Sequence, residues 1–411
     1  MSDPTPRAVT RAFRDSAAGA LATLARVTGS LDLAEDAIQD AFEVAVREWP
    51  RRGVPDDPGA WIFVTARNRA RDRWRRESGR PAREAAAVAP APLAEPDVPA
   101  PVADDLLRLL FTCGHPAIGT AAQITLMLRL VCLLPTATIA RLLLEPESTT
   151  AQRLSRAKRK VRTAAIPFRV PEADVLPERL TPVLKAVELL FTHGYAPQTG
   201  PVVDADACVE ACRLAVLVAD LLPDEPEARG LLALLLLQDS RRATRTDADG
   251  ELVLLEDQDR SRWDAARIAA GRHELARATA LRRLGPYQLQ AMIAAEHATA
   301  DAYGATDWTR IVDAYDQLLA QVPSPVVALN RAVAVAERDG PEPALVLLDA
   351  LADDPRLARS HRLPATRALL LERLGRHDAA AEELARAVAL APDGAERRLL
   401  SRRRSRLRPP G

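Results

Sequence analysis

The sequence predicts an all-helical protein with several folded units. Only 4% of the 411 residues are aromatic, and β-branched runs that alternate with polar residues, the signature of strands, are nearly absent. A chain of this length is longer than one ordinary domain and can bury two or three separate cores. We therefore expect helices throughout and almost no sheet.

The charge and cysteine content narrow the class of protein. The 56 basic and 56 acidic residues cancel, so any attraction to a polyanion must come from local patches. The four cysteines form no CxxC pair and lack the neighbours that a zinc site needs, which predicts buried free thiols in a reducing compartment. We find no leader segment, and the longest apolar run, residues 231–237, is much shorter than a membrane span of about 20 residues. These features predict a cytoplasmic protein without metal, cofactor or membrane partner.

The first informative segment is an amphipathic helix over residues 32–49, "DLAEDAIQDAFEVAVREW". At 100° per residue one face is apolar, comprising Ile38, Ala41, Phe42, Ala45 and Trp49. The opposite face is mostly acidic, comprising Asp36, Gln39, Asp40, Glu43 and Arg47. Such a face is usually solvent-exposed surface. A metal site at Asp32, Asp36 and Asp40 is the alternative, but its ligand set is incomplete.

The next segment, "PDDPGAWIFVTARNRARDRWRR" (55–76), predicts a second helix with concentrated positive charge. Asp57 is the expected N-cap and Pro58 suits the first turn. Like charges four residues apart repel each other, so six arginines within ten residues indicate a partner. Trp61, Phe63, Asn68 and Trp74 are interleaved with or precede them. Phosphate-binding arginines beside groups that stack on bases favour a nucleic-acid surface.

Two breaks divide the chain. The Pro- and Ala-rich stretch at 79–103 predicts a flexible linker, and three prolines at 166–180 predict a second boundary. We expect folded units at 9–78, 104–166 and 180–411.

Residues 136–162 have the pattern of a helix-turn-helix unit. "TATIARLLL" (136–144) predicts a short helix, Pro146 ends it, and Ser148 is the expected cap of a second helix. Its expected buried stripe consists of Ala151, Leu154, Ala157 and Val161. In such a unit the first turns of the second helix enter the major groove. The candidate base contacts are Thr149, Gln152, Arg153 and Arg156, and the candidate phosphate contacts are Lys158, Arg159, Lys160 and Arg162.

The last third of the chain repeats. Three anchor residues, Ile311, Ala344 and Ala380, each begin a set of three positions spaced four and then three residues apart, and a proline follows each set. The spacings between the anchors are close to the roughly 34-residue period of a tetratricopeptide (TPR) repeat. Gly375 is expected in an interhelix turn. The sequence therefore predicts a TPR-like helical solenoid within 180–411, with a basic tail at 396–408 that suits either a nucleic-acid arm or a terminal capping helix.

The order of the two N-terminal helices, over residues 9–78, resembles region 2 of the sigma-70 family in its extracytoplasmic-function (ECF) class. The resemblance implies that the acidic helix docks on the clamp helices of core RNA polymerase, through Asp36, Gln39, Phe42 and Val46. It also implies that the arginine-rich helix opens and reads the promoter −10 strand. The residues near that DNA would be Trp61, Arg67, Asn68 and Arg71.

Residues 104–166 are similar to sigma region 4, which implies that the basic helix reads the −35 element in duplex DNA through Thr149, Gln152, Arg153, Arg156, Arg159 and Lys160. "LLFTCGHPAI" (109–118) and "VELLFTHGYAPQTG" (187–200) resemble segments of ECF factors with a long C-terminal extension. Thr192 and His193 depart from the Asn and Glu expected there. The role of the loop from Thr192 to Tyr195 therefore stays open.

The resulting prediction is a non-enzymatic ECF sigma factor with core RNA polymerase and promoter DNA as partners. Its C-terminal repeats would bind a protein or peptide regulator. The alternatives are a helix-turn-helix regulator with a solenoid sensor and, much less favoured, a metal-dependent helical hydrolase.

Overall fold

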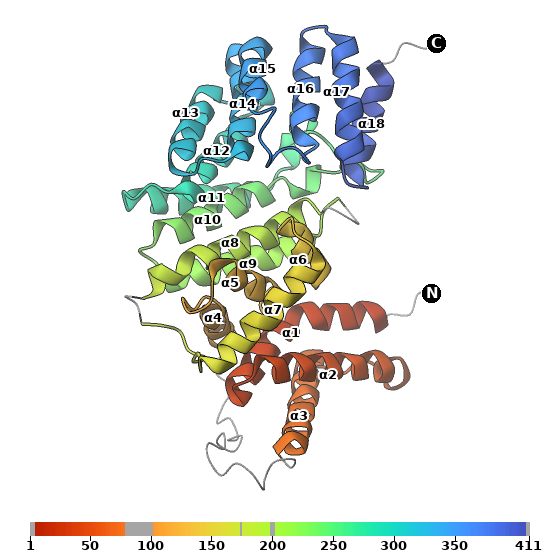
Figure 1. Ribbon diagram of the computed structural model, residues 1–411, viewed down its shortest axis with the longest axis vertical. Coiled ribbons are helices and arrows are strands. Elements are labelled where there is room, and N and C mark those ends of the chain that lie inside the picture. The colour runs from red at the N-terminus through yellow and green to blue at the C-terminus, as the bar shows by residue number, and fades with distance from the viewer. Residues whose placement is uncertain (1–4, 79–101, 173–174, 198–201, 408–411) are drawn as a thin grey trace. The chain divides into compact units, whose positions relative to one another are not determined.

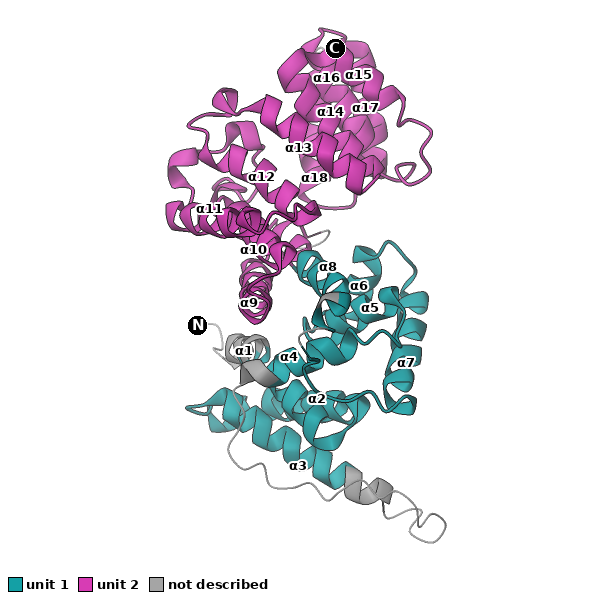
Figure 2. Ribbon diagram, turned by 90° about the vertical axis from the view of Figure 1, so that its left-hand side faces the viewer, with its two compact units in different colours: residues 1–190 teal, residues 191–411 magenta. Residues whose placement is uncertain are grey.

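The computed structural model describes residues 5–78, 102–172, 175–197 and 202–407. Within these ranges the protein is helical, and its one β contact is an isolated bridge between Thr246 and Leu252. The all-helical prediction is confirmed. Contacts divide the chain into two compact units, residues 1–190 and 191–411 (Figure 2). Most of the predicted linker, residues 79–101, lies outside the described ranges.

The N-terminal unit begins with a layer of three helices. They are α1 (Thr5–Thr28), α2 (Leu31–Arg52) and α3 (Pro58–Ser78). In Figure 1, α1 and α2 run side by side and α3 crosses them, and each packs on the other two. Small residues permit this close packing, since Ala17, Ala25, Ala34, Ala41 and Ala66 are fully buried.

Four further helices complete the described N-terminal region before the α8 segment. They are α4 (Val102–Cys113), α5 (Thr120–Leu130), α6 (Thr136–Leu142) and α7 (Glu147–Thr163). α4 packs on α1, and the fully buried carboxylate of Asp105 accepts hydrogen bonds from Thr23 Oγ1 (2.8 Å) and Arg26 Nε (2.7 Å) of α1. A buried carboxylate needs such partners, so this contact fixes how α4 sits on α1.

The C-terminal unit is a succession of helices that each pack on the next. After α8 (Leu176–Tyr195), in which the unit boundary falls, these are α9 (Ala205–Leu221), α10 (Pro226–Asp239), α11 (Ala265–Ala280), α12 (Pro286–Thr299), α13 (Trp308–Gln321), α14 (Pro325–Asp339), α15 (Pro341–Asp349), α16 (Arg362–Arg373), α17 (His377–Leu390) and α18 (Ala395–Leu407). Separate small cores join α12 to α14, α14 to α16, and α16 to α18. A stack of this kind buries only neighbouring faces.

Several local predictions can be compared with this fold. The anchors Ile311, Ala344 and Ala380 are buried, and Gly375 has φ +70° in the turn between α16 and α17, a conformation that glycine adopts without strain. The predicted loop from Thr192 to Tyr195 was wrong, because these residues form the last turn of α8. None of the four cysteines is in a disulfide, and Cys113, Cys208 and Cys212 are buried. No described helix is long and apolar enough to cross a membrane.

Candidate nucleic-acid interface

Helix α2 presents the expected two faces. Ser30 caps it by accepting a hydrogen bond from the Leu33 backbone N–H at 3.2 Å, and the apolar positions predicted from the helical wheel are all buried. Of the four predicted polymerase contacts, Asp36, Gln39 and Val46 are exposed. Phe42 is only 8% exposed and meets Phe13 edge-on with ring centroids 4.9 Å apart.

The exposure of Val46 is informative because it is an apolar side chain left in solvent. It is 59% exposed. Along the same edge of α2, Phe42 lies one helical turn away and Gln39 lies two turns away. Exposed apolar groups bordered by polar ones are typical of docking surfaces. This edge of α2 is therefore suited to contact another protein.

Helix α3 holds its arginines outward by burying a narrow stripe. The Asp57 carboxylate accepts from the Ala60 backbone N–H at 2.9 Å, which confirms the predicted cap. Ile62, Ala66 and Ala70 are fully buried at four-residue spacing. The remaining turns expose Arg67, Asn68 and Arg71. Among the described residues neither Arg67 nor Arg71 has an acidic partner, so both charges are available to a ligand. The side chains from Trp74 to Ser78, including the predicted Arg75 and Arg76, lie outside the described residues.

Arg73 is different, because it ties α3 to α2. Its guanidinium contacts Asp36 at 2.6 Å and Asp40 at 2.8 Å. The sequence prediction grouped Arg73 with the ligand-facing arginines and treated these two aspartates as free surface or metal ligands. Asp36 and Asp40 therefore have a basic partner within the protein. The described residues contain no group of three or more His, Cys, Asp or Glu side chains that could hold a metal ion.

Trp61, the predicted stacking residue, is half-buried at the base of α3. Its ring meets that of Trp49 edge-on, with centroids 5.5 Å apart. Aromatic contacts of this kind hold a side chain in one orientation. Trp61 thus lies on the same helix as Arg67, Asn68 and Arg71 but is anchored against α2.

The segment predicted as a helix-turn-helix unit forms two helices, α6 and α7, and the start of α7 differs from the prediction. α6 ends at Leu142, and Leu144 has φ +55° in the turn. α7 begins at Glu147 without a side-chain cap, so the prediction that Ser148 caps it was wrong. Its buried positions are Thr150, Leu154, Ala157 and Val161. Ala151 is exposed, and Thr150 is buried in its place because its hydroxyl donates to Glu145 at 2.7 Å.

A shallow hollow of about 370 Å³ lies along the exposed side of α7. It brings together five of the six predicted −35 contacts, with a floor from the residues preceding α5. The five are Thr149, Gln152, Arg153, Arg156 and Lys160. The sixth, Arg159, is exposed but does not line the hollow.

Arg153 is paired with an acidic residue in the turn that precedes α7. It binds Glu145 through two hydrogen bonds, one of them Nη2 to Oε2 at 2.6 Å. Burial would raise the pKa of Glu145, but the hydrogen bonds from Arg153 and Thr150 outweigh it and hold that pKa below its ordinary value. Arg153 therefore stabilises the turn before α7, a role that the sequence prediction missed.

The C-terminal half of α7 faces α2. Lys158 Nζ contacts the Glu35 carboxylate and lies 3.4 Å from Asp32, while Arg162 lies 3.3 Å from Asp32. Arg129 of α5 reaches Glu35 at 2.6 Å. We call these five residues the α2–α7 cluster. Two of the predicted phosphate contacts, Lys158 and Arg162, thus have acidic partners within the protein.

The electrostatics of the cluster are strongest at Glu35. Burial would raise its pKa, yet the hydrogen bond and charge of Lys158 and the charge of Arg129 hold the pKa below the ordinary value. Both Glu35 and Lys158 are less than one-fifth exposed, at 16% and 18%. Solvent therefore screens this pair less than a surface ion pair.

Two known family models match parts of the chain. Residues 13–80 match sigma-70 region 2, and residues 179–279 match a family of unknown function (DUF6596). The chain thus carries a sigma-70 region 2 domain on α1 to α3, which supports a sigma-factor role in transcription initiation with core RNA polymerase and promoter DNA as partners.

The full-length comparison gives a particular family. The chain is 44% identical over 388 residues to the uncharacterized protein R00370 of Rhizobium meliloti (strain 1021), covering 92% of this chain and 90% of that protein. The chain belongs to the same family as this rhizobial protein. No solved structure matches the present chain.

Proposed function

We propose that this protein is an ECF-class sigma factor that directs core RNA polymerase to promoters with −10 and −35 elements. The observation that carries the proposal is the coincidence of the region 2 match, residues 13–80, with the two surfaces of α2 and α3. One edge of α2 exposes Asp36, Gln39 and Val46. α3 exposes three arginines, Arg67, Arg69 and Arg71, that have no acidic partner among the described residues, beside the amide of Asn68.

The second DNA contact would be α7. Its hollow gathers polar and basic side chains near the helix N-terminus, the part of a recognition helix that reads base edges. Thr149 and Gln152 offer hydrogen bonds, while Arg156 and Lys160 offer charge. The protein would have no catalytic residues of its own, because the polymerase performs the chemistry.

The C-terminal unit would regulate this activity in the cytoplasm. Small hydrophobic cores join its successive helices, as a TPR-like solenoid requires. In the simplest arrangement a protein or peptide regulator binds these repeats. Its basic terminal helix, α18, pairs Arg398 and Arg402 with Glu251 and Arg403 with Glu372, which favours a capping role over a nucleic-acid arm.

The proposal can be tested by run-off transcription of fragmented genomic DNA, with core polymerase and this protein as the added specificity factor. We expect defined start sites that share a bipartite upstream motif. Start sites should be lost with Gln39→Ala combined with Val46→Asp, which alters the docking edge, and retained with Arg47→Ala, an exposed control on the same helix.

The main competing function, a helix-turn-helix regulator with a sensor unit, gives a different result. Such a protein would bind duplex DNA through α7 but would not need the α2 edge and would produce no start sites with core polymerase alone. Absence of start sites together with specific duplex binding would contradict the sigma-factor proposal.

A further inference from the structure

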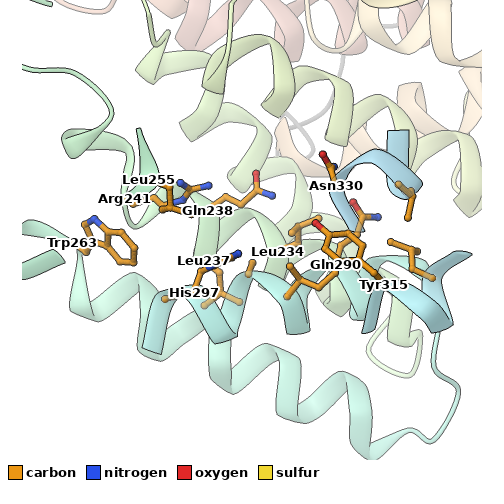
Figure 3. A pocket seen from close by; sticks show the side chains of 15 residues that line it. Leu234, Leu237, Gln238, Arg241, Leu255, Trp263, Gln290, His297, Tyr315 and Asn330 are labelled. Carbon is orange, nitrogen blue, oxygen red and sulfur yellow. The ribbon is translucent and has the colours of Figure 1, made fainter. Parts of the chain in front are cut away.

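The C-terminal unit contains a cavity that the proposed function does not use. Its volume is about 320 Å³, and its walls come from α10, α12, α13, α14 and the segment between α10 and α11. Gly230 allows the close approach of α10 and α12, since a Cβ there would lie 2.8 Å from the backbone N of Gln288. Figure 3 shows Arg241, Trp263 and His297 toward one end and Tyr315, Gln290 and Asn330 toward the other.

Arg241 supplies a positive charge at the first end, and its guanidinium lies 5.6 Å from the centroid of the Tyr195 ring. It lines the cavity, and among the described residues it has no acidic partner. Burial lowers the pKa of its guanidinium, and Arg245 lowers it further against the opposing effect of Tyr195. Arginine nonetheless keeps its proton in proteins. Arg241 is only partly exposed, and a cation shielded from water without a counterion is costly, so a negatively charged ligand group would stabilise it.

The nearest groups add positive potential instead of removing it. Arg260 Nη1 donates to the carbonyl oxygens of His297 (2.5 Å) and Ala300 (2.9 Å), while its Nη2 is buried without a partner. The guanidinium lies over the Trp263 ring at 4.6 Å. This places a second arginine behind Trp263, one of the residues that line the cavity.

His297 remains neutral in these surroundings. Burial and the charges of Arg241 and Arg260 lower its pKa to about 4. Its Nδ1 atom is buried and has no hydrogen-bond partner. A neutral imidazole beside Arg241 can donate or accept one hydrogen bond, which makes it a suitable second contact for a polar ligand group.

Two acidic residues of the same unit, Asp239 and Glu396, have other basic partners. Asp239, at the end of α10, binds Arg242 (2.9 Å) and Arg267 (2.7 Å). Glu396 binds His361 at 2.9 Å. Neither is positioned by these contacts to neutralise Arg241. Arg241 thus differs from Arg242 and Arg267, which pair with a carboxylate.

The body of the cavity is suited to an apolar group. Leu234, Leu237, Ile293, Leu318 and Tyr315 form much of its wall, and Gln238, Gln290 and Asn330 supply neutral amides. The volume is near the lower limit of ligand sites, roughly 300–1,000 Å³. A small molecule fits this space, whereas a folded partner or an extended peptide does not.

We propose that this cavity binds a small organic carboxylate, with the carboxylate on Arg241 and an apolar or aromatic body along Leu237 and Ile293. One guanidinium beside a neutral imidazole matches a single negative charge with planar geometry. A phosphoryl group with two charges would exceed the single guanidinium that lines the cavity and would leave one charge uncompensated. The proposal is independent of promoter recognition, because it concerns binding by the C-terminal unit alone.

The test is calorimetric titration of the full-length protein with matched pairs of probes: hexanoate and hexanamide, phenylacetate and phenylacetamide, indole-3-acetate and its amide. We expect at least one acid to bind about tenfold or more tightly than its amide, the ratio that corresponds to about 1.4 kcal/mol. Arg241→Gln should remove that preference. Arg376→Gln, at an exposed arginine in the turn before α17, is the matched control and should retain it.

The melting temperature of the variant and competition by phosphate provide two further tests. Because Arg241→Gln removes a buried charge without a counterion, the ligand-free variant should have an unchanged or higher melting temperature, which also shows that it folds. Inorganic phosphate should not compete with the bound acid. The proposal is overturned if no acid binds more tightly than its amide, if Arg241→Gln folds and binds the acid as well as wild type, or if phosphate binds as tightly as the acids.

Discussion

The two basic helices of the N-terminal unit, α3 and α7, contain similar numbers of basic residues, but these residues differ in how many of them pair with an acid inside the protein. Arg67 and Arg71 on α3 are exposed and have no acidic partner among the described residues. On α7, Arg153 is paired with Glu145, and Lys158 is paired with Glu35. Counting positive residues would make the helices equal. The comparison shows that α3 offers most of its described charge to a ligand directly, whereas α7 holds Arg153, Lys158 and Arg162 in internal ion pairs.

This difference has a structural cause. The acids that neutralise α7 come from the turn before it and from the first turns of α2, both of which pack beside it. α3 meets α2 further along, where one arginine, Arg73, occupies both nearby carboxylates. Among the described side chains of α3, Arg67, Arg69 and Arg71 form no ion pair with an acid on α2.

The largest effect is expected on α3. Replacing Arg67 and Arg71 together with alanine should reduce run-off transcription by about 10- to 100-fold, because two charges that no internal acid screens are lost from the DNA surface. Arg47→Ala, which removes an exposed arginine on α2, should change it little. Equal activity of the double variant and wild type would show that α3 does not contact the promoter.

A smaller and more selective effect is expected at the α7 hollow. Gln152→Ala should weaken discrimination at one −35 base pair by about 1–3 kcal/mol, because an amide that reads a base edge is lost. Competition binding with single-base variants of the mapped promoter measures this. The control is Ser155→Ala, an exposed position on α7 outside the hollow. Uniform weakening across all base variants would assign Gln152 to the backbone instead.

The α2–α7 cluster predicts an effect of opposite sign. Glu35→Gln should release Lys158 and Arg129 from their partner and strengthen duplex binding several-fold at low salt. If Lys158 then contacts one more phosphate, the slope of log K against log salt should steepen by about 0.9. Glu43→Gln removes one exposed acid from the same helix and serves as the charge-matched control. An identical gain in both variants would mean that net charge, and not the cluster, limits binding.

The smallest effect is the pH dependence of this cluster. The pKa of Glu35 is lowered in the folded protein, so its ion pairs stabilise the fold above the unfolded pKa of about 4.3, and the stabilisation is lost as the pH falls through the lower folded value. The melting temperatures of wild type and Glu35→Gln should therefore differ near pH 7 and converge in acid. A constant difference down to about pH 2 would contradict the assignment.

Sequence reasoning predicted the helical fold, both faces of α2, the Asp57 cap of α3 and most of the buried stripe of α7, because each depends on residues three or four positions apart. It missed the first turn of α7, where the hydrogen bond from Thr150 to Glu145 draws a polar residue inward in place of Ala151. That bond joins residues five positions apart. The sequence did contain a signal for it, because Glu145 lies beside the turn and Thr150 and Arg153 follow it.

Other features depend on contacts that periodicity does not encode. Lys158 and Glu35 are 123 residues apart, and the groups around the cavity come from helices whose order in space the sequence does not reveal. Arg241 follows a leucine-rich helix and looks like an ordinary C-terminal cation. Only the fold shows that no described acid neutralises it.

The buried Asp105 has a practical consequence for dividing this protein into fragments. Its hydrogen bonds join α4 to α1, on the other side of residues 79–101 in the chain, so the contact does not depend on the covalent connection between the two helices. A protease site introduced within 79–101 should yield a nicked protein whose two pieces remain associated. A fragment that stops at residue 78 would instead expose the α4-binding surface of α1 and leave Thr23 and Arg26 without their acceptor, so a stable N-terminal fragment should extend through α4.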